Sequence, residues 1–199
     1  MRNFDILKKV IKMDIKEMLQ FLHIAENLKQ VPRHSWTSKG NREDVAAHSW
    51  RMTLMALMIE DEFQDINMNR VLELCVVHDL GEAITEDIPC FEKTEKDENV
   101  EILAQKQLVE SVSGPFQKKL QSLFDEMNEM KTKEAKLYKC LDKLEALIQH
   151  NEASLDTWLP LERELQMTYG NQECEAFEWM KQLRDQVRED SIIKIKEGK

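Results

Sequence analysis

Apolar residues recur along much of this chain at intervals of three and four positions, which places them on one face of an α-helix. Over residues 14–30 six residues keep this spacing: Ile15, Met18, Leu19, Leu22, Ala25 and Leu28. The pattern stops at Pro32, because proline cannot continue a helix. Residues 45–63 and 68–80 are apolar on nearly every side. Segments of that kind are typical of buried, central helices.

Further helical patterns occupy the second half of the chain, over residues 102–112, 116–130, 133–150 and 174–190. We expect the charged stretch 91–101 to be a solvated connection and the Lys-rich tail after residue 190 to fray. Together these patterns predict an all-α bundle of six or more helices. The core is expected over about 15–150, followed by C-terminal helices over 151–190, all in one domain.

The composition supports this fold class. The 199 residues include only 5 Gly and 4 Pro, too few for the many turns of a sandwich or barrel. A chain of 199 residues suffices for one good core but is short for two typical domains. The net charge of −10 argues against a nucleic-acid partner, because phosphate backbones are bound by clustered Lys and Arg.

The cysteines and the N-terminal residues bear on where the protein works. The four cysteines form no C-x-x-C pair, so we expect reduced thiols in a cytosol. The first residues are charged throughout, and no apolar run is long enough to span a bilayer. These features predict a cytoplasmic protein with no membrane partner, and they leave a homodimer open as its assembly.

Four ionisable residues interrupt the apolar helical patterns: His48, His78, Asp79 and Asp142. Buried ionisable groups must be paired or must bind a metal. Taken singly, each is more often a hydrogen-bonded core histidine, a helix cap or a surface carboxylate, and three other histidines illustrate that ordinary case: His23, His34 and His150. Taken together, imidazole and carboxylate suit divalent Mn, Fe, Co, Ni or Zn better than Ca or Mg.

The geometry of the His-Asp pair sets a condition on this metal hypothesis. Adjacent residues of a helix point about 100° apart. His78 and Asp79 can therefore share one ion only if the end of their helix faces it. A basic loop over residues 31–44, in an otherwise acidic chain, could meet an anion beside such an ion; its basic and aromatic residues are Arg33, His34, Trp36, Lys39 and Arg42.

A His, a His-Asp pair and a distant Asp on a helical bundle resemble the pattern of the HD-domain phosphohydrolases. The matching stretches are "DVAAHSWRM", "CVVHDLGEAITEDI" and "LYKCLDKLEAL". His78 follows His48 by 30 positions and Asp142 follows Asp79 by 63 positions, as in compact members of the family. The resemblance spans roughly residues 15–150, and the combined motif is more specific than its pieces.

Within that family the chain is most similar to the YfbR-like 5′-deoxynucleotidases. Their active site includes a Glu three residues after the His-Asp pair and an Asp five residues further on, and Glu82 and Asp87 match them. Arg33 and Trp36 in "LKQVPRHSW" match substrate contacts of that branch. Arg51, one turn after His48, could also face a phosphate.

The resemblance implies one divalent transition-metal ion, of Co, Mn, Fe, Ni or Zn, at His48, His78, Asp79 and Asp142. It implies that Glu82 orients or deprotonates the attacking water and that Asp87 protonates the leaving sugar oxygen. Arg33 would clamp the phosphate of a small phosphorylated nucleoside, and Trp36 would pack against its sugar or base.

Each of these roles has an ordinary structural alternative. Trp36 could be core filling, and Arg51 could be a surface ion-pair partner. Glu82 could be an exposed carboxylate at a helix end, and Asp87 a cap or turn residue.

Three departures from the family pattern put the substrate in doubt. Ala47 stands where an acidic residue usually precedes the first His, Glu86 replaces a common Gly, and "RHSW" lacks the usual small residues between Arg and Trp. A lost acid at Ala47, with Lys39, Arg42 and Arg51 as local cations, favours substrates from mono- to triphosphates. The altered positions also resemble a family member with a modified pocket that acts on a phosphorylated nucleoside analogue, and this resemblance implies oxetanocin A phosphate, on a route to an antibiotic, as a further expected substrate.

Other functions remain alternatives at this stage. A strict 5′-deoxynucleoside monophosphatase would have the same metal ligands. A non-catalytic helical sensor would need neither Glu82 nor Asp87, so both residues count against it. Guanosine tetraphosphate hydrolases typically carry a Glu-Asp pair that "HDLGEA" lacks, and cyclic-nucleotide phosphodiesterases need further histidines for a second metal.

Overall fold

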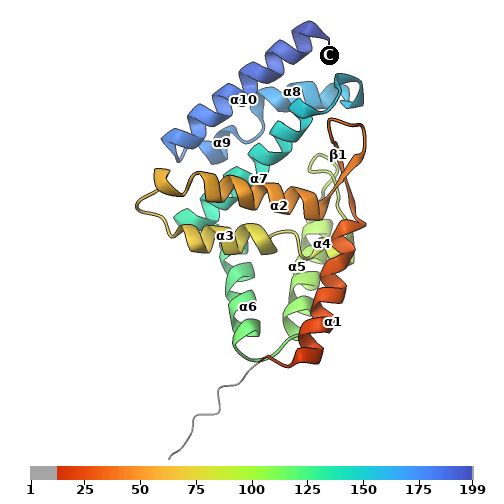
Figure 1. Cartoon of the computed structure of the whole chain (residues 1–199), viewed down its shortest axis with the longest axis vertical. Helices are drawn as coiled ribbons and strands as arrows, with labels where there is room; N and C mark the ends of the chain where they lie inside the picture. Colours follow the sequence, from red (N-terminus) through yellow and green to blue (C-terminus); the bar gives the residue numbers. More distant parts are fainter. Residues whose placement is uncertain (1–12, 199) are drawn as a thin grey trace, which may run out of the picture.

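Helices make up most of the computed structural model, which describes residues 13–198 (Figure 1). This confirms the all-α class. The α-helices are α1 (Ile15–Ala25), α2 (Val45–Met58), α3 (Met68–Val77), α4 (Glu82–Thr85), α5 (Glu95–Glu110), α6 (Gly114–Glu129), α7 (Lys133–Glu152), α8 (Pro160–Thr168), α9 (Asn171–Cys174) and α10 (Glu178–Glu197). Short 3-10 helices are η1 (Glu26–Lys29), η2 (Glu60–Glu62) and η3 (Leu155–Thr157), and the strands are β1 (Pro32–Trp36) and β2 (Arg42–Asp44).

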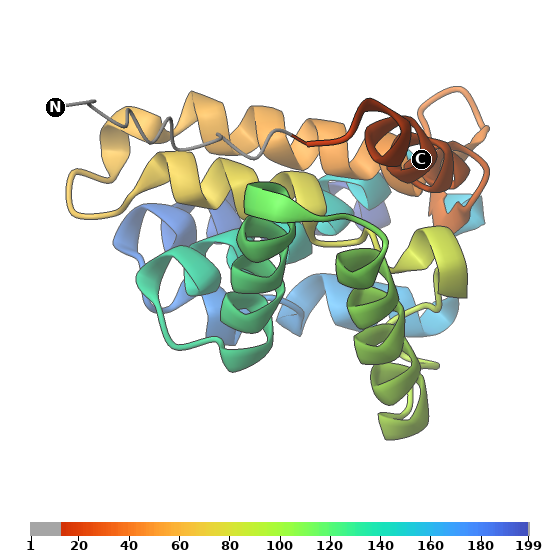
Figure 2. The ribbon, with the colours of Figure 1, turned by 90° about the horizontal axis from the view of Figure 1, so that it is seen from below.

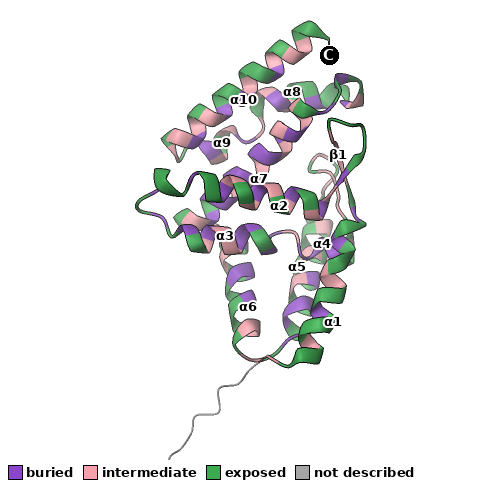
Figure 3. Ribbon diagram, viewed as in Figure 1, coloured by how far each residue is buried: buried purple, intermediate pink, exposed green. Residues whose placement is uncertain are grey.

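Helix α7 is the centre of the bundle. It packs against α2 and α3, which lie side by side in both Figure 1 and Figure 2, and against α9 and α10. Helices α8 to α10 gather at one end of the molecule, and α1, α4, α5 and α6 gather at the other. Buried residues concentrate where α2, α3 and α7 meet (Figure 3).

The sequence of α7 explains its central place. Thr132 caps it by accepting the Ala135 N–H at 3.0 Å, which satisfies one of the free donors of the first turn. Leu137, Leu141 and Leu144 are completely buried, as their spacing predicts. Asp142 lies at the edge of this stripe with 15% of its side chain exposed, so a carboxylate emerges where the core meets a cavity.

The predicted basic loop forms a β-hairpin. Strand β1 pairs with β2 in an antiparallel manner, with an irregular register between Pro32 and Trp36. The turn closes through bonds from the Thr37 N–H to the Asn41 carbonyl and from the Gly40 N–H to the Thr37 carbonyl. Gly40 has φ of 79°, a conformation that glycine adopts without strain. Strand β1 also packs against α7, which brings the hairpin to the site.

Two segments are more helical than their sequences predicted. The charged stretch 91–101 enters α5 at Glu95, because Thr94 and Asp97 form a capping box. The tail expected to fray continues α10 to Glu197. Ser191 is fully buried and donates to Asn151 Oδ1 at 2.8 Å, so tertiary contacts hold this end of the helix.

Helix α1 buries little of its predicted apolar stripe. Phe21 is buried and meets the ring of Phe116 edge to face, with the centroids 5.5 Å apart. The stripe residues exposed to solvent are Ile15, Met18, Leu19 and Leu22. Within residues 13–198, none of the helices combines the length and apolar character that a bilayer crossing requires.

Candidate active site

The His-Asp pair stands at the end of a helix, as the metal hypothesis requires. Helix α3 ends at Val77, His78 is its C-cap, and the chain then turns through Asp79 before α4 begins at Glu82. The turn is closed by bonds from Leu80 N–H to the Val77 carbonyl and from Glu82 N–H to the Asp79 carbonyl. Both side chains of the pair can therefore face one point.

Four ligand atoms converge at that point from three segments of the chain. His48 Nε2 lies 3.2 Å from His78 Nε2, 3.3 Å from Asp142 Oδ1 and 3.8 Å from Asp79 Oδ2. His78 Nε2 lies 2.9 Å from Asp79 Oδ2. Ligands about 2.1 Å from one ion and at right angles to each other are about 3 Å apart. The ligand atoms of His48, His78 and Asp142 all lie within 4.8 Å of one another, so these three have the dimensions of a metal coordination shell, and Asp79 Oδ2 stands beside them next to His78.

The hydrogen bonds on the far side of each imidazole favour a cation at the centre of this cluster. His78 Nδ1 faces the Cys75 carbonyl at 2.8 Å, and His48 Nδ1 faces the carboxylate of Glu145. A carbonyl and a carboxylate only accept, so both Nδ1 atoms carry the proton. Both Nε2 lone pairs then point at each other and at two carboxylates. A divalent ion fits this set of acceptors.

The pKa values express the same demand for positive charge. Burial and Arg33 oppose protonation of His48, yet Glu145 and Asp142 raise its pKa to about 9. Burial would raise the pKa of Asp79, but His78 and His48 hold it well below its usual value. Burial likewise opposes the charge of Asp142, while Lys139 and His48 lower its pKa. These carboxylates thus favour positive charge at the centre of the cluster.

Glu82 and Asp87 are buried acids beside the cluster. Glu82 is 8% exposed, and its Oε2 has no hydrogen-bond partner among the described residues. Burial, with Asp79 and Asp87 nearby, raises the pKa of Glu82 to about 10. Burial also raises the pKa of Asp87, although Arg33 opposes that shift. Such acids are suited to take up or deliver a proton.

Arg33 points its guanidinium at these acids without a close hydrogen bond from its fork. Its Nη1 is 3.5 Å from Asp79 Oδ2 and 3.9 Å from Asp87 Oδ1, and its Nε is 3.5 Å from Glu43 Oε2. Nε is buried and unpartnered in the described structure. Although burial would lower the pKa of Arg33, Asp79 and Glu145 raise it. A charged, incompletely bonded guanidinium is a ready anion ligand.

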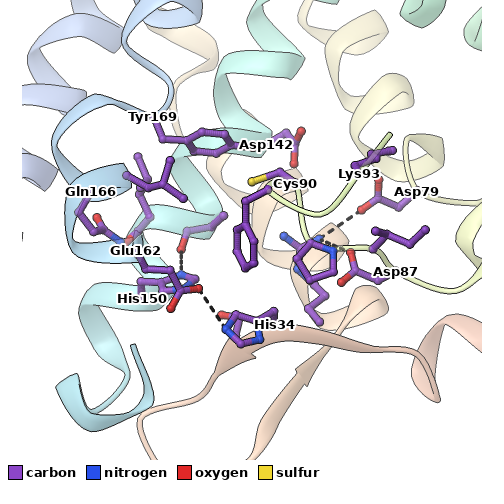
Figure 4. Close-up of a pocket in the computed structure, with 18 of the residues that line it drawn as sticks. His34, Asp79, Asp87, Cys90, Lys93, Asp142, His150, Glu162, Gln166 and Tyr169 are labelled. Atoms are coloured by element: carbon purple, nitrogen blue, oxygen red, sulfur yellow. Dashed lines mark hydrogen bonds and ion pairs between the residues drawn. The ribbon is translucent and has the colours of Figure 1, made fainter. Parts of the chain in front are cut away.

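A cavity extends from the cluster to the opposite wall formed by α7 and α8 (Figure 4). Asp79, Asp87 and Lys93 lie at one side of it, and His150, Glu162 and Gln166 lie at the other. The ring of His34 stands between them, edge to face with Phe91 at 5.7 Å between centroids. Other lining residues include Arg33, Ser35, Glu82, Ile88, Pro89, Cys90, Lys139, Asp142, Leu165 and Tyr169.

Two expected substrate contacts lie outside this cavity. Trp36 is covered by the guanidinium of Arg42, 4.8 Å from the ring centre, and His34 is the hairpin ring that lines the cavity instead. Arg51 lies behind His48, where its Nε donates to Glu145 Oε1 at 2.6 Å. In this structure Arg51 therefore acts as an ion-pair partner, the ordinary alternative to a phosphate contact.

The basis for expecting triphosphates also changes. Ala47 is exposed and does not line the cavity, and Lys39 lies exposed in the hairpin turn. The cations that line the cavity besides Arg33 are Lys93 and Lys139. Sequence reasoning missed both, although Lys139 precedes Asp142 by one helical turn and donates to its Oδ2 at 2.7 Å.

Sequence reasoning also missed a second group of acids around His48. Glu43, His48 and Glu145 are all buried, with their ligand atoms within 4.8 Å of one another. Burial and Glu145 raise the pKa of Glu43 to about 7, against the effect of Arg33. The position of Glu145, one turn after Asp142 on the same helix, was the available signal.

Comparison with known proteins relates this site to a described family. The family model for the HD domain matches residues 25–184. The 5′-deoxynucleotidase HDDC2 of Bos taurus is 36% identical over 145 residues, which are 69% of this chain and 68% of that protein. The human 5′-deoxynucleotidase HDDC2 is 34% identical over 141 residues, with 69% of this chain and 68% of that protein covered.

A solved structure is also similar in fold. It is the crystal structure of a predicted metal-dependent phosphohydrolase from Magnetospirillum magnetotacticum, with a TM-score of 0.79. The match covers 90% of this chain and 93% of that chain at 20% identity. At that identity the likeness concerns the fold.

Proposed function

This chain belongs to the HD-domain family and is a phosphohydrolase of its 5′-deoxynucleotidase branch, and from that premise we propose that it releases phosphate from deoxynucleoside 5′-monophosphates in the cytoplasm. One observation carries the proposal: the four converging ligand atoms lie beside an incompletely bonded Arg33 and two buried acids. The same cavity extends from Arg33 to the wall formed by α7 and α8, where the sugar and base would lie.

The proposed ligands are His48, His78, Asp79 and Asp142. A divalent ion held by these residues would polarise the phosphoryl group and lower the pKa of the attacking water. Arg33 binds the phosphate oxygens, since its Nη1 faces the cavity region shared with Asp79 and Asp87.

Glu82 takes the proton from water, which requires its carboxylate form. Burial, Asp79 and Asp87 raise its pKa to about 10 in the metal-free protein, and a divalent ion beside it would oppose that shift. Asp87 gives a proton to the sugar oxygen as the phosphorus–oxygen bond breaks. The same upward shift of its pKa favours the protonated form needed for that step.

The number of phosphates that the substrate can carry depends on whether lysines of the cavity are free to bind them. Lys139 is 2.7 Å from Asp142 Oδ2, and Lys93 is 2.5 Å from Glu101 Oε1. A second or third phosphate would have to compete with these internal pairs, so we expect monophosphates to be preferred. Triphosphates and analogues such as oxetanocin A phosphate belong in the same assay, because the sequence favoured them.

The test is release of inorganic phosphate from one nucleoside carrying one, two or three 5′-phosphates, in deoxy and ribo form, with metal-stripped and metal-restored protein. The highest kcat/KM is expected for the deoxynucleoside monophosphate. Arg33→Met should lower kcat/KM about 10- to 100-fold, the usual effect of losing a charged hydrogen bond. Lys39→Met removes an exposed cation from the same hairpin and should change little. Metal-restored protein that releases phosphate from none of these substrates would favour the sensor alternative.

A further inference from the structure

A buried row of side chains stands behind His48, on the side away from the cavity. His48 Nδ1 faces one carboxylate oxygen of Glu145, and Arg51 Nε donates to the other at 2.6 Å. Arg51 Nη2 also donates to the Glu145 backbone carbonyl at 3.4 Å, and Nη1 donates to Glu152 at 2.6 Å. His48 and Glu145 are completely buried. The orientation of this carboxylate is thus fixed from both ends.

The two buried acids beside His48, Glu145 and Glu43, each already have an arginine as a positively charged partner. Arg51 neutralises Glu145, and Arg33 stands 3.5 Å from Glu43. Two guanidinium groups leave little need for a second ion, although these two acids and His48 Nδ1 are close enough to hold one. The row is better suited to orient His48 than to bind metal.

We propose that Glu145 is a positioning residue that fixes His48 in the tautomer with its proton on Nδ1, and that Arg51 holds Glu145 in place for this task. The inference rests on the proposed metal site, because that tautomer matters only if Nε2 must bind an ion. It adds a condition for metal binding, control of the His48 tautomer, that the metal ligands and the acids of the cavity do not fulfil.

The argument depends on what each partner can accept or donate. A neutral imidazole carries its proton on either nitrogen, and only the nitrogen without it can bind metal. His78 is fixed by a backbone carbonyl, that of Cys75, which no substitution removes. His48 is fixed by a side chain. Its tautomer therefore depends on the residue at position 145.

Replacing Glu145 with glutamine exposes this dependence. If the new amide oxygen faces His48, its NH2 group faces the Arg51 Nε–H, and two donors oppose each other. If the amide turns round, its NH2 faces His48 Nδ1 and favours the proton on Nε2, where the ion should bind. Both orientations weaken the site. Removing Arg51 as well removes the donor that opposes the first orientation, in which the amide oxygen faces His48. The double variant should therefore recover part of its metal affinity.

The experiment measures the Zn²⁺ affinity of metal-stripped protein by competition with a chromophoric chelator. Glu145→Gln should bind Zn²⁺ about 10- to 100-fold more weakly than the wild type, as is usual when the partner of a metal-binding histidine is lost. Glu145→Gln with Arg51→Met should bind about tenfold more tightly than Glu145→Gln alone. Glu152→Gln, which removes only the exposed partner of Arg51, should match the wild type.

Several results would overturn the inference. Equal affinity of Glu145→Gln and wild type would show that the tautomer does not depend on this carboxylate. A double variant as weak as the single one would assign Glu145 a merely structural role, and thermal unfolding of the metal-free proteins measures that role separately. A wild type that binds no Zn²⁺ would instead refute the proposed metal site.

A measurement on the unaltered protein covers variants that do not fold. Long-range proton–nitrogen correlation spectra of the Zn²⁺-loaded wild type distinguish the two ring nitrogens of His48. The proposal requires a protonated Nδ1 and a metal-bound Nε2. The reverse assignment would overturn it.

Discussion

Glu86 occupies a backbone conformation that strongly favours glycine, and replacing it should stabilise the protein. Its φ is 64° and its ψ is 166°, a region that side chains with a Cβ rarely enter. Glu86 follows α4 directly, where its N–H bonds to the Glu82 carbonyl at 3.0 Å, and it precedes Asp87. The side chain is exposed, so its removal costs little packing.

The expected gain can be worked from two opposing effects. A residue held in this region costs about 1–3 kcal/mol, which glycine would recover. Glycine also gives the unfolded chain more freedom, which costs about 0.4–1 kcal/mol. The net stabilisation of Glu86→Gly should be about 0.5–2 kcal/mol. For a chain of this size that is a rise in Tm of about 1–8 °C.

The assay is chemical and thermal unfolding of metal-free wild type, Glu86→Gly and Glu86→Ala. Alanine removes the same charge and chain but keeps the Cβ, so it should stay within about 0.5 kcal/mol of the wild type. Glycine should be the more stable of the two variants. If glycine is no more stable than alanine, the backbone at this position is not strained and the reasoning fails.

The other predictions concern catalysis, substrate binding and pH. Glu82→Gln and Asp87→Asn should keep their metal, but their kcat for phosphate release should fall about 10²–10⁴-fold. Near-normal kcat in both variants would refute the proton-transfer roles of these residues. His34→Ala should raise KM for the nucleotide with little effect on kcat, since the ring lines the cavity away from the cluster; an unchanged KM would remove His34 from the substrate site. The pKa of Glu43 rises from 4.5 to about 7 on folding, so the folded state keeps a proton that the unfolded chain releases between these values. Metal-free wild type should therefore lose about 1–3 kcal/mol of stability as pH rises through that window. Glu43→Gln should lose less in urea unfolding at pH 5 and pH 8, whereas parallel losses would contradict the assignment.

The sequence was most informative where periodicity and chemistry agreed. The leucines of α7 are buried as their spacing requires, and Asp142 emerges at the edge of their stripe. His78 and Asp79 meet the geometric condition for sharing an ion because α3 ends at Val77. Long helices with clear stripes are the elements that local patterns determine best.

The spacing of residues along the chain could not show which side of His48 a neighbouring residue would contact. Arg51 lies one turn from His48, as predicted, but it reaches the Nδ1 side through Glu145 and not the Nε2 side that faces the cavity. Ala47 adjoins His48 in sequence, yet neighbouring helical positions point about 100° apart, and it is exposed. Such distinctions depend on tertiary packing.

The hairpin and the far wall of the cavity were missed for a related reason. Strand β1 has no alternating apolar pattern, and its pairing with β2 depends on a turn at Gly40. Glu162 reaches His150 at 3.0 Å across the cavity wall, a contact between helices α7 and α8 that spacing along the chain does not reveal. These residues acquire their partners only in the folded bundle.

The most direct test of the metal-centre account is the metal content of the protein together with its phosphate release, after metal stripping and restoration with one divalent ion. The wild type should hold about one ion per chain and release phosphate from a deoxynucleoside 5′-monophosphate. His78→Ala and Asp142→Ala should lose both properties, while His23→Ala, which removes an exposed imidazole from α1, should keep both. If His78→Ala and Asp142→Ala bind the ion as well as the wild type does, the four converging side chains are not the metal site.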